Sequence, residues 1–432
     1  MKVMNKKKVL IICYYWPPAG GPGVQRWLKF VKYLPEFGIE PIVYCPENPS
    51  YPIVDDSLVS DIPNGITIIK QPIKEPYALA KLFSKKSTKS ISSGVIPKKK
   101  KQSFIERLML YVRGNFFIPD ARKNWIKPSV TFLSKYIEEE NIETIITTGP
   151  PHSLHLIGLQ LQKLNNVKWF ADFRDPWTTI GYHKALKLTK SSARKHIDLE
   201  SEVLNSADHF IVTSNHTKQE FETKTKQSIT VITNGYDSHS VRVEEKDKKF
   251  TLSHIGSLLS ERNPIVLWQV LSELVNEHET FSKAFQLNLI GVVSDDVVSS
   301  IEASGLNNHL NIVGYVNHEE AIKYQMKSQA LLLIEIDSED TKAIIPGKLF
   351  EYMISETPIL AVGPENSDIE QIIKSTNTGS YFKYQDKNQL KEQILKYFEL
   401  FENNDLKVNA IGLQPYSRKS LTERLSNLLL EK

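Results

Sequence analysis

The segment IPGKLFEYM at residues 345–353 places a lysine and a glutamate where a helix is expected to begin. Pro346 suits a first helical turn, and Gly347 lets a ligand approach the backbone, whose unpaired amides favour a phosphate. Glu351 follows Gly347 by four residues and Lys348 by three, so the three share one helix face. The carboxylate lies about 5.4 Å further along the axis, where it can accept hydrogen bonds from two vicinal hydroxyls. The segment therefore predicts a site for a nucleoside diphosphate.

The residues on either side place this segment in a strand–helix–strand unit. The apolar runs at 330–336 and 358–362 are predicted strands. Ligands of open parallel sheets bind beyond the carboxyl ends of the strands, which is where the loop before the helix lies. An ordinary amphipathic helix start, with Lys348 and Glu351 as a surface pair, is the alternative interpretation.

The segment resembles the donor-site motif of nucleotide-sugar-dependent glycosyltransferases with the two-domain GT-B fold, in particular their family 4 branch. The resemblance implies that Glu351 holds the ribose of the donor and that the loop before it holds the phosphates. It gives donor-binding roles to Gly347, Lys348 and Leu349 as well. It extends over most of the chain and is strongest at 251–264 and 345–368.

The chain departs from the family pattern at one position of this motif. Many members have a second glutamate eight residues earlier, where this chain has Ala343. Glu335 and Glu339 in the same loop are the candidates to replace it. The contacts to the donor sugar are the part of the site that this departure affects.

A second donor loop, SHIGSLLSERNP, opens the predicted second domain. The family pattern has a glycine followed by an arginine, and a lysine five residues further on, and both cations grip the diphosphate. Here Gly256 matches, Ser257 replaces the arginine, and Arg262 falls at the lysine position. The resemblance thus implies that one guanidinium from this loop binds the diphosphate together with Lys348.

Three loops of the first half follow predicted strands and contain candidates for the acceptor and sugar side. The first, YYWPPAGGPGVQRW, is not G-x-G-x-x-G, so a dinucleotide site is not expected. The second places His152 just past a strand, and His155 inside the next helix is expected to pack. From the resemblance we assign the acceptor and sugar side to Gly20, Gly21, Gly23, Arg26, Asp172 and Arg174.

Each of these loops has a structural alternative. The glycines also suit a tight strand-to-helix turn. Asp172, Arg174 and Asp175 crowd together in ADFRDPW, and carboxylates beside an arginine can form a structural ion-pair network. We predict Arg262, Lys348, Asp175 and His152 as the catalytic residues.

Apolar strands alternate with helices in both halves of the chain, which predicts parallel sheets covered on both sides. We expect an α/β protein of two Rossmann-like, doubly wound domains facing across a cleft, as in the GT-B fold. The predicted domains are 1–240, with a basic insertion near 81–127, and 249–405 for the nucleotide sugar. From 406 to 432 we expect a helix, with leucines at 421, 425, 428 and 429, that returns to the first domain.

The composition is that of a soluble globular protein, with 41% hydrophobic and 24% charged residues. No apolar run approaches the roughly 20 residues of a membrane span, and the N-terminal apolar stretch reads as a buried strand, so we expect a cytoplasmic location. Only Cys13 and Cys45 are present, both on predicted strands, which favours buried free thiols.

The net charge of +4 is unevenly distributed along the chain. Between Lys81 and Lys127 there are thirteen Lys or Arg residues against Glu106 and Asp120. Aromatic and aliphatic residues interleave with these cations, a pattern that favours an anionic membrane surface. A solvated loop is the alternative, and nucleic acid is not expected because no nucleic-acid motif accompanies the charge.

These observations predict a glycosyltransferase that moves a sugar from a nucleoside diphosphate to a saccharide or lipid-linked acceptor, in surface polysaccharide or glycan assembly. The resemblance implies retention of anomeric configuration and activity without a metal, and no cofactor is expected. The rivals are a non-hydrolysing nucleotide-sugar 2-epimerase, with Asp172, Asp175 and His152 as conceivable acid/base groups, and a nucleotide-sugar-binding protein without activity.

Overall fold

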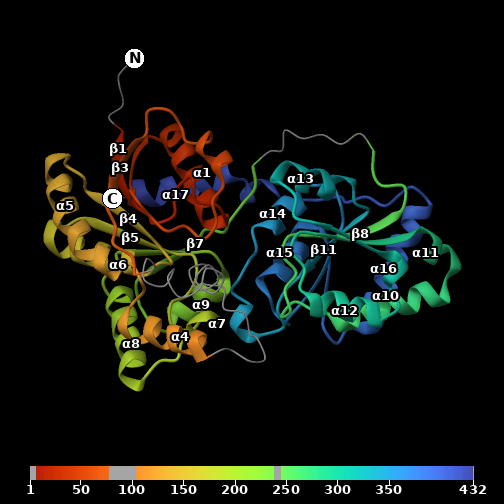
Figure 1. Cartoon of the computed structure of the whole chain (residues 1–432). Coiled ribbons are helices and arrows are strands. Elements are labelled where there is room, and N and C mark those ends of the chain that lie inside the picture. The colour runs from red at the N-terminus through yellow and green to blue at the C-terminus, as the bar shows by residue number, and fades with distance from the viewer. Residues whose placement is uncertain (1–5, 77–103, 238–244, 432) are drawn as a thin grey trace, which may run out of the picture. The chain divides into compact units, whose positions relative to one another are not determined.

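The computed structural model of the chain describes residues 6–76, 104–237 and 245–431. The chain forms two compact units, one of Met1–Asn234 with Arg418–Lys432 and one of Gly235–Ser417 (Figure 1). The basic residues from Lys81 to Lys101, on which much of the predicted insertion rests, lie outside the described residues. No helix among the described residues is long and apolar enough to cross a membrane.

Unit 1 is built on a parallel sheet of seven strands in the order β3-β2-β1-β4-β5-β6-β7. Consecutive residues of its central strand belong to different cores, with Leu10 and Ile12 in one and Val9 and Ile11 in the other. This alternation is why the strand reads as a continuous apolar run. The strands are β1 (Lys7–Ile12), β2 (Ile39–Pro46), β3 (Thr67–Gln71), β4 (Thr144–Gly149), β5 (Lys168–Phe173), β6 (His209–Val212) and β7 (Ser228–Val231).

Helices cover this sheet, and the last helix of the chain is among them. Leu421, Leu425 and Leu429 are buried in the core that also contains Trp27 and Leu28 of α1. Figure 1 shows α17 beside α1, as the predicted return to the first domain requires. The helices of unit 1 are α1 (Pro22–Tyr33), α4 (Phe104–Phe116), α5 (Ile126–Glu139), α6 (Ser153–Asn165), α7 (Gly181–Lys184), α8 (Lys190–Leu204), α9 (Asn215–Glu222) and α17 (Arg418–Leu430).

Unit 2 repeats the plan with six parallel strands in the order β10-β9-β8-β11-β12-β13. Leu332 and Ile334 of β11 lie in one core, and Leu331 and Leu333 lie in the other. The strands are β8 (Phe250–Ile255), β9 (Phe285–Ile290), β10 (Leu310–Gly314), β11 (Ala330–Ile334), β12 (Ile359–Gly363) and β13 (Gly379–Lys383). The helices are α10 (Ile265–Glu277), α11 (Glu279–Ala284), α12 (Asp295–Ala303), α13 (His318–Lys327), α14 (Lys348–Met353), α15 (Asp368–Thr376) and α16 (Lys387–Glu402).

The structure adds to the sequence prediction and refines its bounds. The edge strand β3 and the helix α5 form in stretches on either side of the expected insertion, where no element was predicted, although Val130, Leu133 and Ile137 of α5 form a buried helical stripe. The returning helix α17 begins at Arg418, inside the predicted range 406–432, and α14 begins at Lys348, inside the predicted segment 345–353. Unit 2 also begins at Gly235 and includes residues up to Ser417.

Candidate functional site

A pocket opens at the point of the second sheet where the chain changes direction. The strands β8 and β11 are neighbours in the sheet. After β8 the chain continues to β9 in one direction across the sheet, and after β11 it continues to β12 in the other direction. Such a switch point leaves a crevice at the carboxyl ends of the two strands. The cavity itself is small, about 30 Å³, and it opens into a larger solvent-filled space of about 380 Å³. Its lining comes from the loop after β8, from β11 and from the segment leading into α14: Arg262, Leu333, Ile334, Glu335, Ile336, Thr341, Ile344, Pro346 and Lys348.

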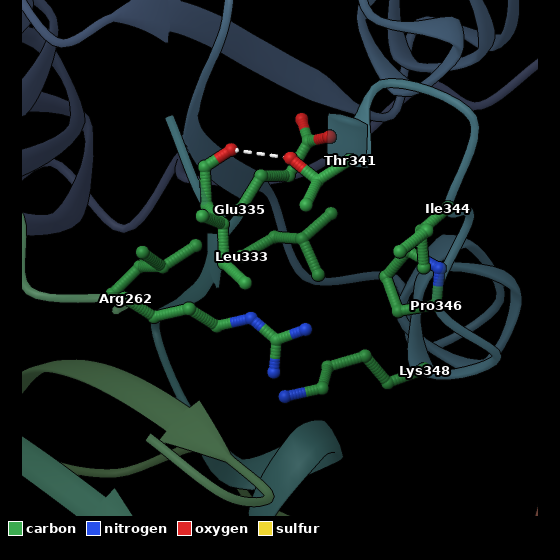
Figure 2. A pocket seen from close by; sticks show the side chains of 9 residues that line it. Arg262, Leu333, Glu335, Thr341, Ile344, Pro346 and Lys348 are labelled. Carbon is green, nitrogen blue, oxygen red and sulfur yellow. Dashed lines mark hydrogen bonds between the residues drawn. The ribbon is translucent and has the colours of Figure 1, made fainter. Parts of the chain in front are cut away.

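The pocket brings together the two cations that the sequence predicts to bind the diphosphate. Figure 2 shows the guanidinium of Arg262 and the ammonium of Lys348 pointing toward one another. Among the described residues, Arg262 Nε is buried without a hydrogen-bond partner, and the ring of His254 is the one hydrogen-bond partner of Lys348 Nζ. Neither cation forms an ion pair with a carboxylate of the described residues, which leaves both available to an anion.

Burial and mutual repulsion perturb the protonation of these two groups. Burial, and next the charge of Arg262, lower the pKa of Lys348 to about 7. Burial also lowers the pKa of Arg262, against the field of Glu335. An anion placed between the two side chains would relieve the repulsion and favour the charged lysine.

Gly256 gives Lys348 its place in the pocket. The glycine has a φ of +112°, and a Cβ there would lie 2.8 Å from Lys348 Nζ. Any other residue would be strained in this conformation and would displace the ammonium. Ser257 follows on the exposed surface of the same loop, where its hydroxyl is open to a ligand.

The start of α14 offers fewer free amides than the sequence implied. The amides of Leu349 and Phe350 donate to the carbonyls of Pro346 and Gly347 at 3.1 and 3.2 Å. Leu349 is also fully buried, so neither its side chain nor its amide can hold the donor, contrary to the assignment from the resemblance. The amides of Gly347 and Lys348 have no acceptor among the described residues.

Glu351 lies on the same short helix but is not among the residues that line the pocket. Its Oε2 accepts a hydrogen bond from Gln325 Nε2 at 3.1 Å, and its Oε1 lies 3.8 Å from His318 Nε2, both of α13. The side chain is 23% exposed. The carboxylate is therefore held at a fixed place and is still open to solvent, and its ribose role stays a prediction.

Of the two glutamates offered in place of Ala343, only Glu335 lines the pocket. Its carboxylate accepts hydrogen bonds from Tyr381 and Ser367, both at 2.8 Å. Burial raises the pKa of Glu335 to about 7 despite these two donors. Glu339 is 81% exposed and pairs with Lys342, so it is not directed to the pocket.

In unit 1 the structure joins two predicted residues inside the protein. Arg26 and Asp172 are 1% and 0% exposed and form an ion pair of 2.9 Å. The other oxygen of Asp172 accepts hydrogen bonds from Trp27 Nε1 and Thr148 Oγ1, both at 2.8 Å. This is the structural ion-pair network that the sequence left as the alternative, and it corrects the assignment of Arg26 and Asp172 to the acceptor side.

Arg174 ties two loops of this sheet edge together. Its Nη2 donates to the carbonyl of Pro150, and a Cβ at Gly23 would collide with its guanidinium. Gly21 precedes α1 with a φ of +106°, and a Cβ at Gly20 would lie 2.9 Å from Ile53. The three glycines therefore shape the strand-to-helix turn and admit Arg174.

His152 is buried, contrary to its prediction as a group that reaches substrate. It is 5% exposed and stacks on Trp177, with ring centroids 4.8 Å apart and planes 2° from parallel. Burial, followed by the neighbouring histidines, holds the pKa of His152 well below its usual range. His155 packs on Phe173 at 4.1 Å, as expected.

Asp175 is the carboxylate of this loop that remains available. It is half-buried and has no hydrogen-bond partner among the described residues. Burial raises the pKa of Asp175, opposed by the charge of Arg174. No group of three or more His, Cys, Asp or Glu side chains in the described part of the chain is arranged to hold a metal ion.

His254, which contacts Lys348, was not singled out from the sequence. The signal available was a polar residue in the middle of an otherwise apolar strand, TLSHIG. A buried polar group in such a strand requires hydrogen-bond partners, and this requirement could have identified His254 as a candidate site residue.

No family model and no curated protein matches the chain. Solved structures match over nearly its whole length. The sucrose-phosphate synthase of Thermosynechococcus elongatus is 13% identical with a TM-score of 0.58, over 98% of each chain. Anabaena HepE in complex with UDP-glucose is 12% identical with a TM-score of 0.59, over 98% of this chain and 99% of that one.

A structure to which another activity is assigned also matches the chain. A protein of Listeria monocytogenes assigned as a UDP-N-acetylglucosamine 2-epimerase is 14% identical, with a TM-score of 0.54 over 98% of this chain and 96% of that one. At these identities the likeness concerns the fold. The chain has the GT-B fold, with two Rossmann-like parallel sheets and a last helix that returns to the first unit.

Proposed function

We propose that the protein is a glycosyltransferase that uses a nucleoside-diphosphate sugar. The observation that carries the proposal is the pair of unneutralised cations, Arg262 and Lys348, in the pocket at the switch point of unit 2. Two half-buried cations that face one another without a counterion are unfavourable, and an anionic ligand between them would relieve this repulsion. A diphosphate supplies the required negative charge.

The chemistry requires stabilisation of a leaving group. The bond between the anomeric carbon and the diphosphate oxygen breaks, a bond forms from that carbon to an acceptor hydroxyl, and the hydroxyl proton passes to the released diphosphate or to water. Negative charge builds on the diphosphate, and donors that are already in place stabilise it best. Arg262, Lys348, Ser257 and the amide of Gly347 would supply them, with Glu351 on the ribose.

The finer assignments follow from the family resemblance and the fold. Retention of the anomeric configuration, the family 4 branch and a saccharide or lipid-linked acceptor are part of the proposal. Because the positive charge comes from side chains, we expect transfer to continue in EDTA. Three of the matching structures contain UDP or UDP-glucose, which makes UDP-sugars the first donors to try.

The test is a screen of nucleotide sugars by thermal shift, followed by mass spectrometry of the products. We expect one or a few nucleoside-diphosphate sugars to raise the melting temperature and to be consumed in the presence of an extract of glycan or lipid-linked acceptors. Slow hydrolysis of the donor alone fits a transferase. The proposal would be refuted if none of the nucleotide sugars bound to the protein.

One observation favours the rival 2-epimerase. Asp175 is a half-buried carboxylate whose pKa is raised by burial, as a group that moves protons requires. Incubation of the donor alone in D₂O separates the two reactions. An epimer that carries deuterium at C2 would establish the epimerase reaction. A donor that remains unlabelled would exclude that reaction and support the transferase.

We also propose peripheral contact with an anionic membrane through α4. Leu108, Tyr111, Val112 and Phe116 form a stripe at helical spacing and are 50, 40, 38 and 61% exposed. Asn115 of α4 donates to the carbonyl of Lys187 at 2.8 Å, so the exposed lysines at 184, 187 and 190 lie nearby. An apolar stripe beside cations fits a surface of anionic lipid.

Flotation with phosphatidylglycerol-containing vesicles at low salt tests this contact. We expect the protein to float and the double variant Leu108→Ser with Phe116→Ser to stay in solution. Tyr315→Ser, which removes an 84% exposed aromatic from unit 2, is the matched control and should still float. If the double variant floats as well as the control, α4 is not the contact.

A further inference from the structure

A buried histidine holds the lysine of the donor pocket. His254 lies in β8 and is 1% exposed. Its Nδ1 lies 3.2 Å from the carbonyl oxygen of Leu332 in the neighbouring strand β11, and its Nε2 lies 3.3 Å from Lys348 Nζ. The ring therefore connects the sheet to the first residue of α14.

The partners of the ring bear on its tautomer. The backbone of Leu332 and that of Ser257 both hydrogen-bond to the ring. We assign the proton to Nδ1, which lies 3.2 Å from the Leu332 oxygen, because Nε2 then keeps a lone pair that can accept a hydrogen bond from the Lys348 ammonium. Burial, and next the charge of Lys348, hold the pKa of His254 well below its usual range, so the ring is neutral at physiological pH.

We propose that His254 is a positioning residue of the donor pocket, which holds the Lys348 ammonium beside the Arg262 guanidinium so that both cations meet the diphosphate. The proposal rests on the proposed function for the identity of the ligand. One of the three ammonium protons is used by His254, which leaves two for phosphate oxygens. Without the contact the lysine side chain would be free to leave the pocket, and binding would require its ordering.

This arrangement makes donor binding sensitive to pH. The charged and titratable groups around Lys348 are Arg262 after β8, Glu335 at the end of β11, Glu351 on α14 and His254 itself. Since burial and Arg262 lower the pKa of Lys348 to about 7, a large part of the free protein carries a neutral lysine above that pH. A bound diphosphate raises the pKa, so binding above pH 7 takes up a proton and weakens as the pH rises.

Two variants separate positioning from simple packing. His254→Asn keeps a donor near the place of Nδ1 but cannot reach Lys348, whereas His254→Gln places an acceptor near the position of Nε2. Binding of inorganic pyrophosphate and of UDP is measured by calorimetry at pH 6 and pH 8. We expect His254→Asn to bind both about tenfold more weakly than the wild type, and His254→Gln to remain within about threefold.

The wild type should also bind pyrophosphate more weakly at pH 8 than at pH 6, with proton uptake detected by comparing buffers of different ionisation enthalpy. Equal affinities for His254→Asn and the wild type would overturn the positioning role. So would equal losses of affinity in both variants with equally lowered melting temperatures, since that result describes packing alone.

A measurement without ligand covers the case in which the donor assignment is wrong. The lysines are ¹³C-dimethylated, and the Lys348 signal is assigned with Lys348→Arg and titrated by NMR. We expect His254→Asn, but not His254→Gln, to shift that titration. If the wild type bound neither pyrophosphate nor UDP, the proposed function would fail, and this titration would still decide whether His254 holds Lys348.

Discussion

The two units have the same strand order around their central strands, yet they use charged residues differently at the carboxyl edge of the sheet. In unit 1, Asp172 is surrounded by Arg26, Trp27 and Thr148 and has no exposed surface. In unit 2, Arg262 and Lys348 line a pocket and form no ion pair with a carboxylate of the described residues. A charge neutralised inside the protein holds loops together, and a charge left without a counterion is free to hold a ligand.

The histidines show a related contrast. Four of them in unit 1, His152, His155, His183 and His196, lie among aromatic rings, and burial is the largest cause that lowers the pKa of each. In unit 2, His254 is also buried and neutral, but its second nitrogen contacts a cation of the pocket. Similar burial therefore serves packing in one unit and orientation of a binding residue in the other.

Removal of the buried carboxylate of unit 1 should have the largest effect. Asp172→Ala leaves the Arg26 charge buried and unpaired, and we expect a loss of about 3–5 kcal/mol in the free energy of unfolding, measured by urea titration. Asp175→Ala removes a carboxylate without a partner and should change it by less than about 0.5 kcal/mol. Equal stability of the two variants would contradict the distinction between the loops.

Lys348→Met in unit 2 should weaken ligand binding without a loss of stability, in contrast to Asp172→Ala. We expect affinity for the nucleoside diphosphate to fall by about 10- to 100-fold, because charge-assisted hydrogen bonds are lost. Stability should rise by about 1 kcal/mol, since a partly buried cation without a counterion is removed. Lys374→Met, at an exposed position of α15, is the control. A lower melting temperature for Lys348→Met would argue that the lysine is structural.

Glu351→Ala tests the nucleoside end of the site. We expect UDP to bind about tenfold more weakly and inorganic pyrophosphate to bind unchanged, because only the ribose hydroxyls should meet this carboxylate. Calorimetry with UDP and with 2′-deoxy-UDP checks the assignment. Unchanged affinity for UDP would refute the ribose role.

The smallest of the expected effects is the loss of stability in mild acid that the buried histidines of unit 1 should cause. The pKa values of these histidines are lower in the folded protein than in the unfolded chain, so the unfolded state binds more protons below about pH 6.5. The free energy of unfolding should therefore fall as the pH is lowered, by about 1 kcal/mol from pH 6.5 to 6.0. His183→Gln should make the free energy of unfolding less dependent on pH in this range. An unchanged pH dependence would show that His183 does not contribute to it.

Much of the fold could be predicted because its signals are local. The apolar runs of β1, β4, β8 and β11 and the leucine stripe of α17 report burial directly through residue type and spacing. The edge strand β3 was missed because its residues are only half-buried and lack a continuous apolar run. The predicted basic insertion stays a prediction where it falls on residues 81–103, which lie outside the described ranges.

The site was predictable in part. Arg262 and Lys348 were expected together on the strength of a family resemblance, and the pocket contains both. Arg26 and Asp172 were assigned to the wrong kind of role, since nothing in their spacing reveals that they neutralise one another. His152 was assigned from its place after a strand, and its stacking on Trp177 could not be read from the loop.

Residue types and their order were enough to predict two parallel sheets and the loops at their strand ends, because burial and helix or strand periodicity act over a few neighbouring residues. The partnership of each charge required the folded protein. Residues 26 and 172, or 254 and 348, are far apart along the chain, and only packing across strands decides whether a charged group meets a counterion, a ring nitrogen or an open pocket.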